Sequence, residues 1–213
     1  MGVMRMGYIH VRVTDLAEAK QHYGTTMGLY QTLERDGRVY YKGWDEWDHH
    51  SVVLEEGGVG YVKAGWKCER PEDVADIERL TVLYGYPVER MSAGENPEVG
   101  DGIRVTLPSG HVMEFYSSMT AWGVEVGTHN PDAFPRHMVG IGAPRLDHAL
   151  LWVTELDSIE RFFIDVLGMW PTERVRTGLE DDAKTLGTWL TLGESNHDIA
   201  LLEAPENKIH HFA

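Results

Sequence analysis

The chain has 213 residues, of which 42% are hydrophobic and 25% are charged, so it is long enough for one large or two small globular domains with their own cores. Its formal net charge of −15 argues against nucleic acid and anionic membrane as partners, because phosphates attract the opposite charge; a small anionic substrate stays compatible with it. With a single cysteine, no long apolar run and no secretory pattern, we expect no disulfide framework, no transmembrane helix and a cytoplasmic location.

The first part of the chain predicts the order β-α-β-β-β. Residues 8–14 alternate and include β-branched side chains, which is typical of a strand. Asp15 is an N-cap candidate for a helix over residues 16–23, and Gly28 ends that segment. Asp36-Gly37 is a hairpin signal between the first two of three further strands. These strands are expected at 30–35, 38–42 and 51–55.

The same order recurs from residue 61. A strand over 61–68 precedes a helix that Pro71 opens. Three more strands follow, and the tripeptide Pro108-Ser109-Gly110 forms a turn between the last two. The strands are expected at 88–91, 103–107 and 111–116. The apolar stripe of the helix is expected to consist of Val74, Ile77, Leu80 and Leu83.

The segment 119–143 is rich in glycine and loop residues, and after it the strand–helix pattern starts again at residue 146. We therefore predict an N-terminal domain over residues 1–120, a connection over 121–143 and the first part of a second domain over 144–213. The second domain is expected to have strands at 146–153, 173–177, 185–191 and 198–203, a helix at 156–167, and a further unit that begins at Ile209.

Residues 9–29 match residues 149–169 without gaps at a constant spacing of 140 residues. Val13 falls on Val153 and Gly28 on Gly168, while Tyr8 falls on His148. This match predicts a duplicated module in which residues 6–56 and 146–204 superpose. A histidine in only one copy indicates a site that was added to one module.

Two histidines open the first strands of successive repeats, His148 and His211. Each alone is more often structural, and His211 lies close to the end of the sequence. Their pairing matters, because two imidazoles and one carboxylate on one face are the arrangement that holds non-haem Fe(II). A structural role and a metal site both remain open from the residues alone.

His197 opens a third strand, and it is either a surface turn residue or an acid–base group near a bound substrate. Glu114 lies in an apolar strand, where we favour a glutamate without a catalytic role. His49 and His50 are expected on opposite faces of a strand, which prevents them from chelating one ion together. Most of the remaining histidines are expected in solvated loops or on the surface, namely His10, His22, His49, His50, His129 and His137.

With these motifs in order along the whole chain, the sequence resembles the catechol 2,3-dioxygenases, which are type I extradiol ring-cleaving enzymes of the vicinal-oxygen-chelate, or glyoxalase, superfamily. The segments that carry the resemblance are Gly2–Arg5, Gly37–Tyr40, Pro108–His111, Asn130–Arg136, Arg145–Ala149, Asn196–Ala200 and Ile209–His211.

The resemblance implies an α+β fold of four βαβββ modules in two pairs, with iron only in the C-terminal pair. It implies that His148 and His211 bind Fe(II) and that His197 is the catalytic acid–base group. The third ligand of the family is a glutamate in the fourth module, which by internal symmetry requires on the order of 60 residues beyond Ala213. The resemblance therefore implies that the chain is truncated. Glu114 holds the matching place in the second module.

The implied function is extradiol (meta) cleavage of a catechol by O₂ to a 2-hydroxymuconic semialdehyde, in bacterial aromatic degradation, by an enzyme that forms a homo-oligomer when complete. One alternative is a metal-free binding or resistance module of the same superfamily, and another is an inactive fragment. We expect the isolated chain to lack activity and to associate through an uncovered sheet face. That face is drawn from Leu150, Trp152, Leu190, Leu192, Ile199 and Leu201.

Overall fold

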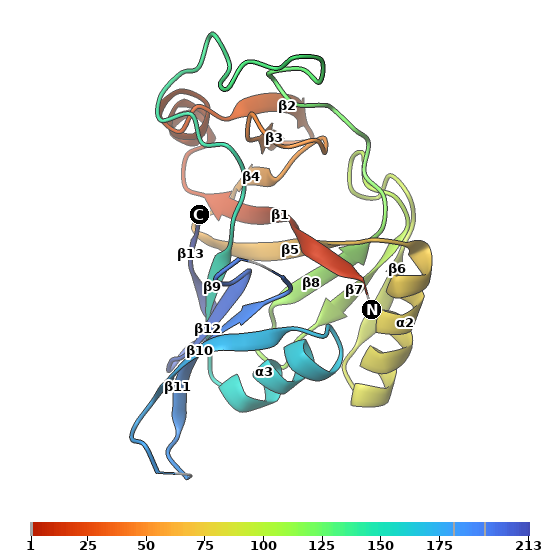
Figure 1. Ribbon diagram of the computed structural model, residues 1–213, viewed down its shortest axis with the longest axis vertical. Helices are drawn as coiled ribbons and strands as arrows, with labels where there is room; N and C mark the ends of the chain where they lie inside the picture. The colour runs from red at the N-terminus through yellow and green to blue at the C-terminus, as the bar shows by residue number, and fades with distance from the viewer. Residues whose placement is uncertain (1, 181, 194) are drawn as a thin grey trace.

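The computed structural model describes residues 2–180, 182–193 and 195–213 of the protein (Figure 1). It consists of two mixed β-sheets and a few helices, which confirms the predicted α+β class. The helices are α1 (Leu16–Lys20), the π-helical η1 (Gln21–Thr26), α2 (Pro71–Tyr84) and α3 (Leu156–Asp165). The strands are β1 (Val3–Val13), β2 (Tyr30–Arg35), β3 (Arg38–Lys42), β4 (Val52–Glu56), β5 (Gly60–Cys68), β6 (Val88–Met91), β7 (Gly102–Thr106), β8 (Val112–Tyr116), β9 (Ala149–Val153), β10 (Trp170–Arg176), β11 (Thr185–Thr191), β12 (Ile199–Glu203) and β13 (Lys208–Phe212).

The first two modules share one eight-stranded sheet with the order β2-β3-β4-β1-β5-β8-β7-β6. Within each module the first strand pairs in parallel with the last one, as β1 does with β4 and β5 with β8. The two modules join where β1 and β5 pair antiparallel along most of their length. The sheet is therefore a tandem repeat of one βαβββ unit.

The third module repeats this arrangement in a five-stranded sheet with the order β10-β11-β12-β9-β13. The register also repeats. Ile9 pairs with Val52 in the first module, and Ala149 pairs with Ile199 in the third. A backbone hydrogen bond from Ile9 N to Ser51 O has its counterpart between Ala149 N and Asp198 O. The predicted correspondence of residues 6–56 with 146–204 is thus confirmed in strand order and register.

The helix predicted over residues 16–23 begins as expected but changes type. Asp15 caps it, since its side chain accepts a hydrogen bond from Glu18 N at 2.9 Å. The α-helix ends at Lys20 and continues as the π-helix η1. Gly28 then ends the segment with φ 76°, and a Cβ there would lie 2.1 Å from Val139 O. The glycine therefore allows the connection to pack closely against the first module.

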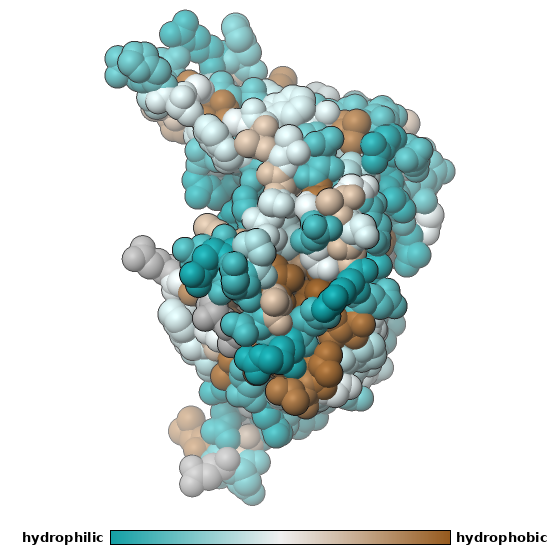
Figure 2. All heavy atoms as spheres, turned by 90° about the vertical axis from the view of Figure 1, so that its right-hand side faces the viewer, coloured by the Kyte–Doolittle hydropathy of each residue, from teal (hydrophilic) through white to brown (hydrophobic). Residues whose placement is uncertain are grey.

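The apolar stripe predicted for α2 is correct at Val74 and Ile77 but wrong at Leu83, which is 75% exposed. The predicted positions are three residues apart, which is less than the 3.6 residues of one helical turn. Each position is therefore rotated around the helix relative to the one before it, and the last one no longer faces the core. Thr81 is buried in its place. Figure 2 faces the side on which α2 lies, and brown apolar side chains reach the surface there.

The two sheets share a hydrophobic core that runs continuously from the first module to the third. Trp66 of β5 contacts Phe163 of α3, with ring centroids 6.2 Å apart. Tyr86, which follows α2, stacks on Phe162 at 5.0 Å. Both helices lie at the same end of the molecule in Figure 1. The first two modules therefore support the third through aromatic contacts, while the exact domain boundaries stay a prediction.

The connection between the sheets contains isolated bridges but no named helix or strand. Its Glu125 forms an ion pair at 3.2 Å with Lys42, whose side chain is fully buried. Trp44 Nε1 donates to Gly142 O at 3.0 Å. The loop after β3 thus holds the connection in place. None of the helices in the described part of the chain combines the length and apolar character that a bilayer crossing requires.

The open face of the third module differs from the predicted one. Leu190, Ile199 and Leu201 are fully buried in the core with the α3 side chains, so they do not belong to the open face. Because side chains alternate along β9, Leu150 and Trp152 lie on the other face together with His148. Leu192 also packs against the core, so the predicted set holds for Leu150 and Trp152 and was too broad. The sequence does not separate the two faces, because both are apolar in these strands.

Candidate functional site

His148 and His211 converge at the edge where β9 and β13 pair. His148 precedes β9, and His211 lies on β13 opposite Leu150. Their Nε2 atoms are 3.3 Å apart. The antiparallel ladder brings them together although 63 residues separate them in sequence. The predicted pairing of these two imidazoles is therefore present in the structure.

The second nitrogen of each ring has its own partner. His148 Nδ1 lies 2.7 Å from Asp147 Oδ2, and His211 Nδ1 lies 2.7 Å from His210 Nδ1. A carboxylate partner fixes the proton on Nδ1 of His148, which leaves the Nε2 lone pair free. The Nε2 atoms of His148 and His211 face one another.

His197 completes what we call the histidine cluster, defined as His148, His197 and His211. It precedes β12, and its ring centroid lies 4.3 Å from that of His148. Burial, followed by the neighbouring His148, lowers the pKa of His197. Burial and His148 also lower the pKa of His211. Neutral imidazoles are the form that binds metals and accepts protons.

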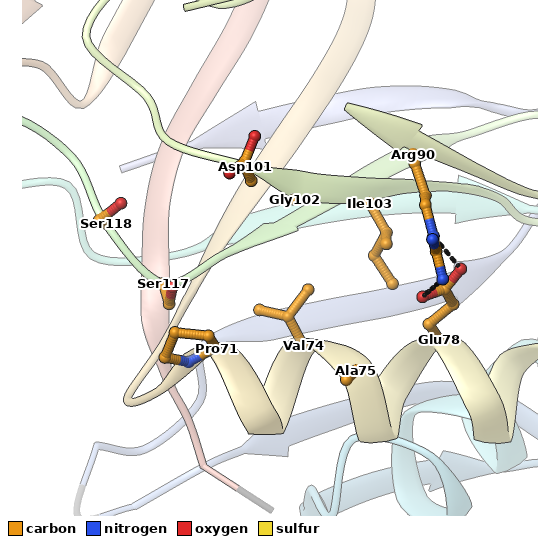
Figure 3. A pocket seen from close by; sticks show the side chains of 10 residues that line it. All are labelled: Pro71, Val74, Ala75, Glu78, Arg90, Asp101, Gly102, Ile103, Ser117 and Ser118. Atoms are coloured by element: carbon orange, nitrogen blue, oxygen red, sulfur yellow. Dashed lines mark hydrogen bonds and ion pairs between the residues drawn. The ribbon is translucent and has the colours of Figure 1, made fainter. Parts of the chain in front are cut away.

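Two hollows adjoin the histidine cluster, one beside His197 and one beside His211. The first has a volume of about 320 Å³ and is lined by Glu173, Trp189 and Asn196 as well as His197. A third hollow of about 290 Å³ lies between α2 and β7 (Figure 3), where Glu78 and Arg90 form an ion pair. Its lining contains no histidine, so the acid–base chemistry gathers at the histidine cluster instead.

The geometry of His148 and His211 fits a divalent metal ion. Imidazole nitrogens bind such ions at about 2.0–2.1 Å, so two of them are about 3.0–3.4 Å apart at common coordination angles. The observed separation of 3.3 Å falls in this range. The described residues contain no group of three or more His, Cys, Asp or Glu side chains that could hold an ion. The cluster therefore offers two candidate ligands, and Asp147 lies beside Nδ1 of one of them, His148.

The register identifies a matching cluster in the first two modules. Tyr8 corresponds to His148, and His50 corresponds to His197, since each lies the same number of residues before a paired strand position. Lys63 corresponds to His211, because Lys63 pairs with His10 and His211 with Leu150, and His10 and Leu150 match. Both ladders have a bulge at this point. We call Tyr8, His50, Lys63 and Glu114 the N-terminal cluster.

Glu114 is the centre of the N-terminal cluster and is fully buried. Its Oε1 accepts from Lys63 Nζ at 3.1 Å and from Arg104 at 2.6 Å. Its Oε2 accepts from Asn96 Nδ2 at 2.8 Å and from the Tyr8 hydroxyl. Burial and then the Glu114 charge raise the pKa of Tyr8. The carboxylate is therefore satisfied by internal donors.

Three histidines expected at the surface are buried instead, namely His10, His49 and His50, while His22, His129 and His137 are exposed as predicted. His49 and His50 also do not lie on a strand. Their Nδ1 atoms are 3.1 Å apart, so the expectation of opposite faces is wrong. The correspondence of Lys63 with His211 and of His50 with His197 was not predicted from the sequence. An alignment of the repeats would need a gap of eight residues in total, because Tyr8 and His148 are 140 positions apart whereas Lys63 and His211 are 148 positions apart.

Comparison with known proteins agrees with this geometry. The family model for the catechol 2,3-dioxygenase-like N-terminal domain matches residues 63–127. The crystal structure of the 2,3-dioxygenase LapB from Pseudomonas sp. KL28 superposes with a TM-score of 0.93 at 35% identity, over 100% of this chain and 74% of that one. An extradiol ring-cleaving dioxygenase from B. fuscum has a TM-score of 0.81 at 27% identity, over 99% and 56%. Fold and site thus define a vicinal-oxygen-chelate dioxygenase.

The relatives found by sequence similarity identify the family within this class of dioxygenases. A metapyrocatechase from Pseudomonas sp. (strain CF600) is 36% identical over 99% of this chain and 69% of its own length. A manganese-dependent 2,3-dihydroxybiphenyl 1,2-dioxygenase from Geobacillus genomosp. 3 is 25% identical over 99% and 68%. The chain belongs to the metapyrocatechase, or catechol 2,3-dioxygenase, family. Its relatives are extradiol dioxygenases, a metal-dependent class.

Proposed function

We propose that this chain takes part in Fe(II)-dependent extradiol cleavage of a catechol-type substrate by O₂, with His148 and His211 as iron ligands. The observation that carries the proposal is the 3.3 Å separation of their Nε2 atoms where the start of β9 pairs with the end of β13. Because one relative is named as manganese-dependent, the choice of iron over manganese is part of the proposal. The third ligand, a glutamate by family resemblance, is not among the described residues.

Each residue around the proposed metal site has a distinct proposed role. The bound metal supplies Lewis acidity and an electron path between the catechol and O₂. Asp147 holds the Nδ1 proton of His148, so that Nε2 stays a ligand. His197, beside His148, has a lowered pKa and is suited to accept a proton from the substrate hydroxyl and return it later. Both oxygen atoms of O₂ end in the 2-hydroxymuconic semialdehyde product.

The proposal includes a cytoplasmic, homo-oligomeric protein organised as two domains with the boundaries given above. The free and buried Cys68 is compatible with a reducing compartment. The metal-free binding module remains the competing function, and it shares the fold but requires no iron. The two functions differ in whether His148 and His211 bind a metal ion.

The proposal is tested by adding Fe(II) anaerobically to the purified chain and then supplying catechol and O₂. Iron retention that depends on both His148 and His211 supports the site. Formation of the yellow semialdehyde measures turnover, and the isolated chain is expected to form none because the third ligand is not among the described residues. Ligand binding without any metal binding would favour the metal-free module. In an iron-loaded, active form, His197→Ala is expected to keep the metal and lose roughly 100-fold or more in turnover. Loss of iron in that variant would show that its role is different.

A further inference from the structure

The loop between β3 and β4, residues 43–51, contacts the segment that leads into His148. Asp45 N donates to Pro144 O at 3.0 Å, and Leu146 N donates to Glu46 Oε1 at 3.1 Å. Leu146 lies two residues before His148. A loop of the first module is therefore hydrogen-bonded to the backbone that carries a proposed metal ligand of the third module.

Glu46 is only 8% exposed, and its two carboxylate oxygens serve different segments. Oε2 accepts from Gly43 N and from Ser51 Oγ, both at 2.5 Å, and so closes the loop itself. Oε1 accepts from Leu146 N and so reaches the other sheet. One oxygen thus organises the loop, and the other holds the strand start.

In the third module, the described residues of the matching loop close it with bonds inside that module. Its matching loop is closed by Asp198, whose Oδ2 accepts from Leu192 N at 2.7 Å and from Thr191 Oγ1 at 3.1 Å. By register, Leu192 corresponds to Gly43. Both bonds stay within the loop. The bond from Glu46 to Leu146 is therefore an addition to loop closure, and it has a separate effect on the strand start.

The strand start is also held from the opposite direction. Asp147 N donates to Ala213 O at 2.8 Å, and Ala213 N donates to His148 O at 3.0 Å. These bonds tie His148 to the strand that carries His211. Glu46 then fixes the same segment relative to the first module. The backbone from Leu146 to His148 is thus restrained by two partners. Glu46 binds it at Leu146, and Ala213 binds it at Asp147 and His148.

We propose that Glu46 is a positioning residue that sets the orientation of His148 toward His211 through its bond to Leu146 N. This inference rests on the proposed function, because the orientation matters for the metal ion that the two imidazoles bind. It also assigns the N-terminal module a task in the metal site, although that module contributes no ligand to it.

The test compares Glu46→Gln with Ser51→Ala and Asp45→Ala. A glutamine has one carbonyl oxygen, which accepts from Gly43 N or from Leu146 N but not from both, while its amide group faces the other N–H. Ser51→Ala removes a loop-closing bond and leaves Oε1 in place. Asp45→Ala removes an exposed ion pair to Arg145 in the same segment. If Glu46→Gln folds poorly, Glu46→Asp, which keeps the charge but is too short to span both sides, replaces it.

Two quantities are measured on the whole chain: hydrogen–deuterium exchange at the Leu146 amide, and the apparent Kd for Co(II) alone. Glu46→Gln is expected to speed exchange at Leu146 and to weaken Co(II) binding roughly 10-fold, as loss of an outer support of a metal ligand does. Ser51→Ala and Asp45→Ala are expected to leave both quantities within about two-fold of the unsubstituted chain.

Unchanged exchange and Co(II) affinity in a folded Glu46→Gln protein would overturn the inference, and so would equal changes in Ser51→Ala. If the unsubstituted chain fails to bind Co(II), the proposed function is contradicted. In that case exchange at Leu146 alone decides whether Glu46 holds the strand start.

Discussion

The N-terminal cluster and the histidine cluster occupy the same register positions of the same fold, but their chemistry differs. In the first, Tyr8 and Lys63 turn toward the buried Glu114, and their hydrogen bonds and charges are satisfied internally. In the second, the Nε2 atoms of His148 and His211 face one another at 3.3 Å, and no carboxylate of the described residues lies between them. The backbone thus provides the geometry, and a few side chains decide whether it holds an internal ion pair or is open to a metal ion.

The source of positive charge explains the difference. The N-terminal cluster has two cations at its carboxylate, because its own Lys63 and the neighbouring Arg104 both contact Glu114. An additional metal ion there would meet two like charges. In the histidine cluster, burial and the neighbouring histidines lower the pKa of His197 and His211, which favours their neutral forms. We therefore expect this cluster to accept a cation and the N-terminal cluster to repel one.

The largest expected effect is the loss of metal binding in His148→Ala or His211→Ala. One remaining imidazole holds a divalent ion poorly, so affinity should fall by roughly 100-fold or more. Co(II) or Fe(II) equilibrium dialysis measures this. His129→Ala, which removes an exposed histidine of the connection, is the matched control and should bind normally. Normal metal binding by both His148→Ala and His211→Ala would show that these histidines do not hold the ion, and it would contradict the contrast between the two clusters.

The next effect concerns stability. Glu114→Ala leaves Lys63 and Arg104 without their shared buried carboxylate, and breaking such a group costs about 3–5 kcal/mol. Urea unfolding should show this loss, while the affinity for Co(II) at the histidine cluster stays unchanged. Glu89→Ala is the control, because its contact with Arg104 is at the surface. A parallel loss of metal affinity in Glu114→Ala would mean that the two clusters are not independent.

A smaller effect appears in the pH dependence of folding. Burial, followed by His49 and His10, lowers the pKa of His50 from 6.5 to about 3. The unfolded chain therefore binds more protons below pH 6.5, and stability falls as the pH drops from about 6.5 toward 3, by about 1.4 kcal/mol per pH unit for one such group. His50→Gln should reduce the slope between pH 6 and 5 in urea titrations. An unchanged slope would show that His50 is already protonated in the folded chain.

The smallest effect is expected for Asp147→Asn. The Asp147 carboxylate accepts the Nδ1 proton of His148, and its neutral replacement weakens that bond without removing a ligand. Metal affinity should fall roughly 10-fold, which is the lower end for an outer partner of a metal-binding histidine. An affinity equal to that of the unsubstituted chain would show that backbone restraint alone orients His148.

Much of the fold could be predicted from the sequence, because the local patterns agree with the final structure. The strands Tyr30–Arg35 and Arg38–Lys42 begin and end where the alternation predicts, and Asp36 and Gly37 adopt the positive φ angles of a hairpin turn. The beginning of β1 at Val3 was missed, because its first residues pair only with β5, far along the chain.

The site was predictable where it depends on residue type and repeat spacing, and unpredictable where it depends on register. The pairing of His148 with His211 was expected from their places in successive repeats, although His211 lies near the end of β13 and not at its start. The match between Lys63 and His211 is missed by an ungapped comparison at a spacing of 140, because these two residues are 148 positions apart. The contact between Glu46 and Leu146 joins segments 100 residues apart and leaves no local pattern.

The central claim is that the histidine cluster binds a divalent metal ion and the N-terminal cluster does not. Paramagnetic Co(II) broadens NMR signals of nearby nuclei, so a titration followed in ¹H–¹⁵N spectra locates the ion directly. We predict that the imidazole signals of His148 and His211 broaden first, while the signals of His50 and the Lys63 amide stay sharp. Broadening centred on His50 and Lys63, or equal broadening of both clusters, would contradict the account.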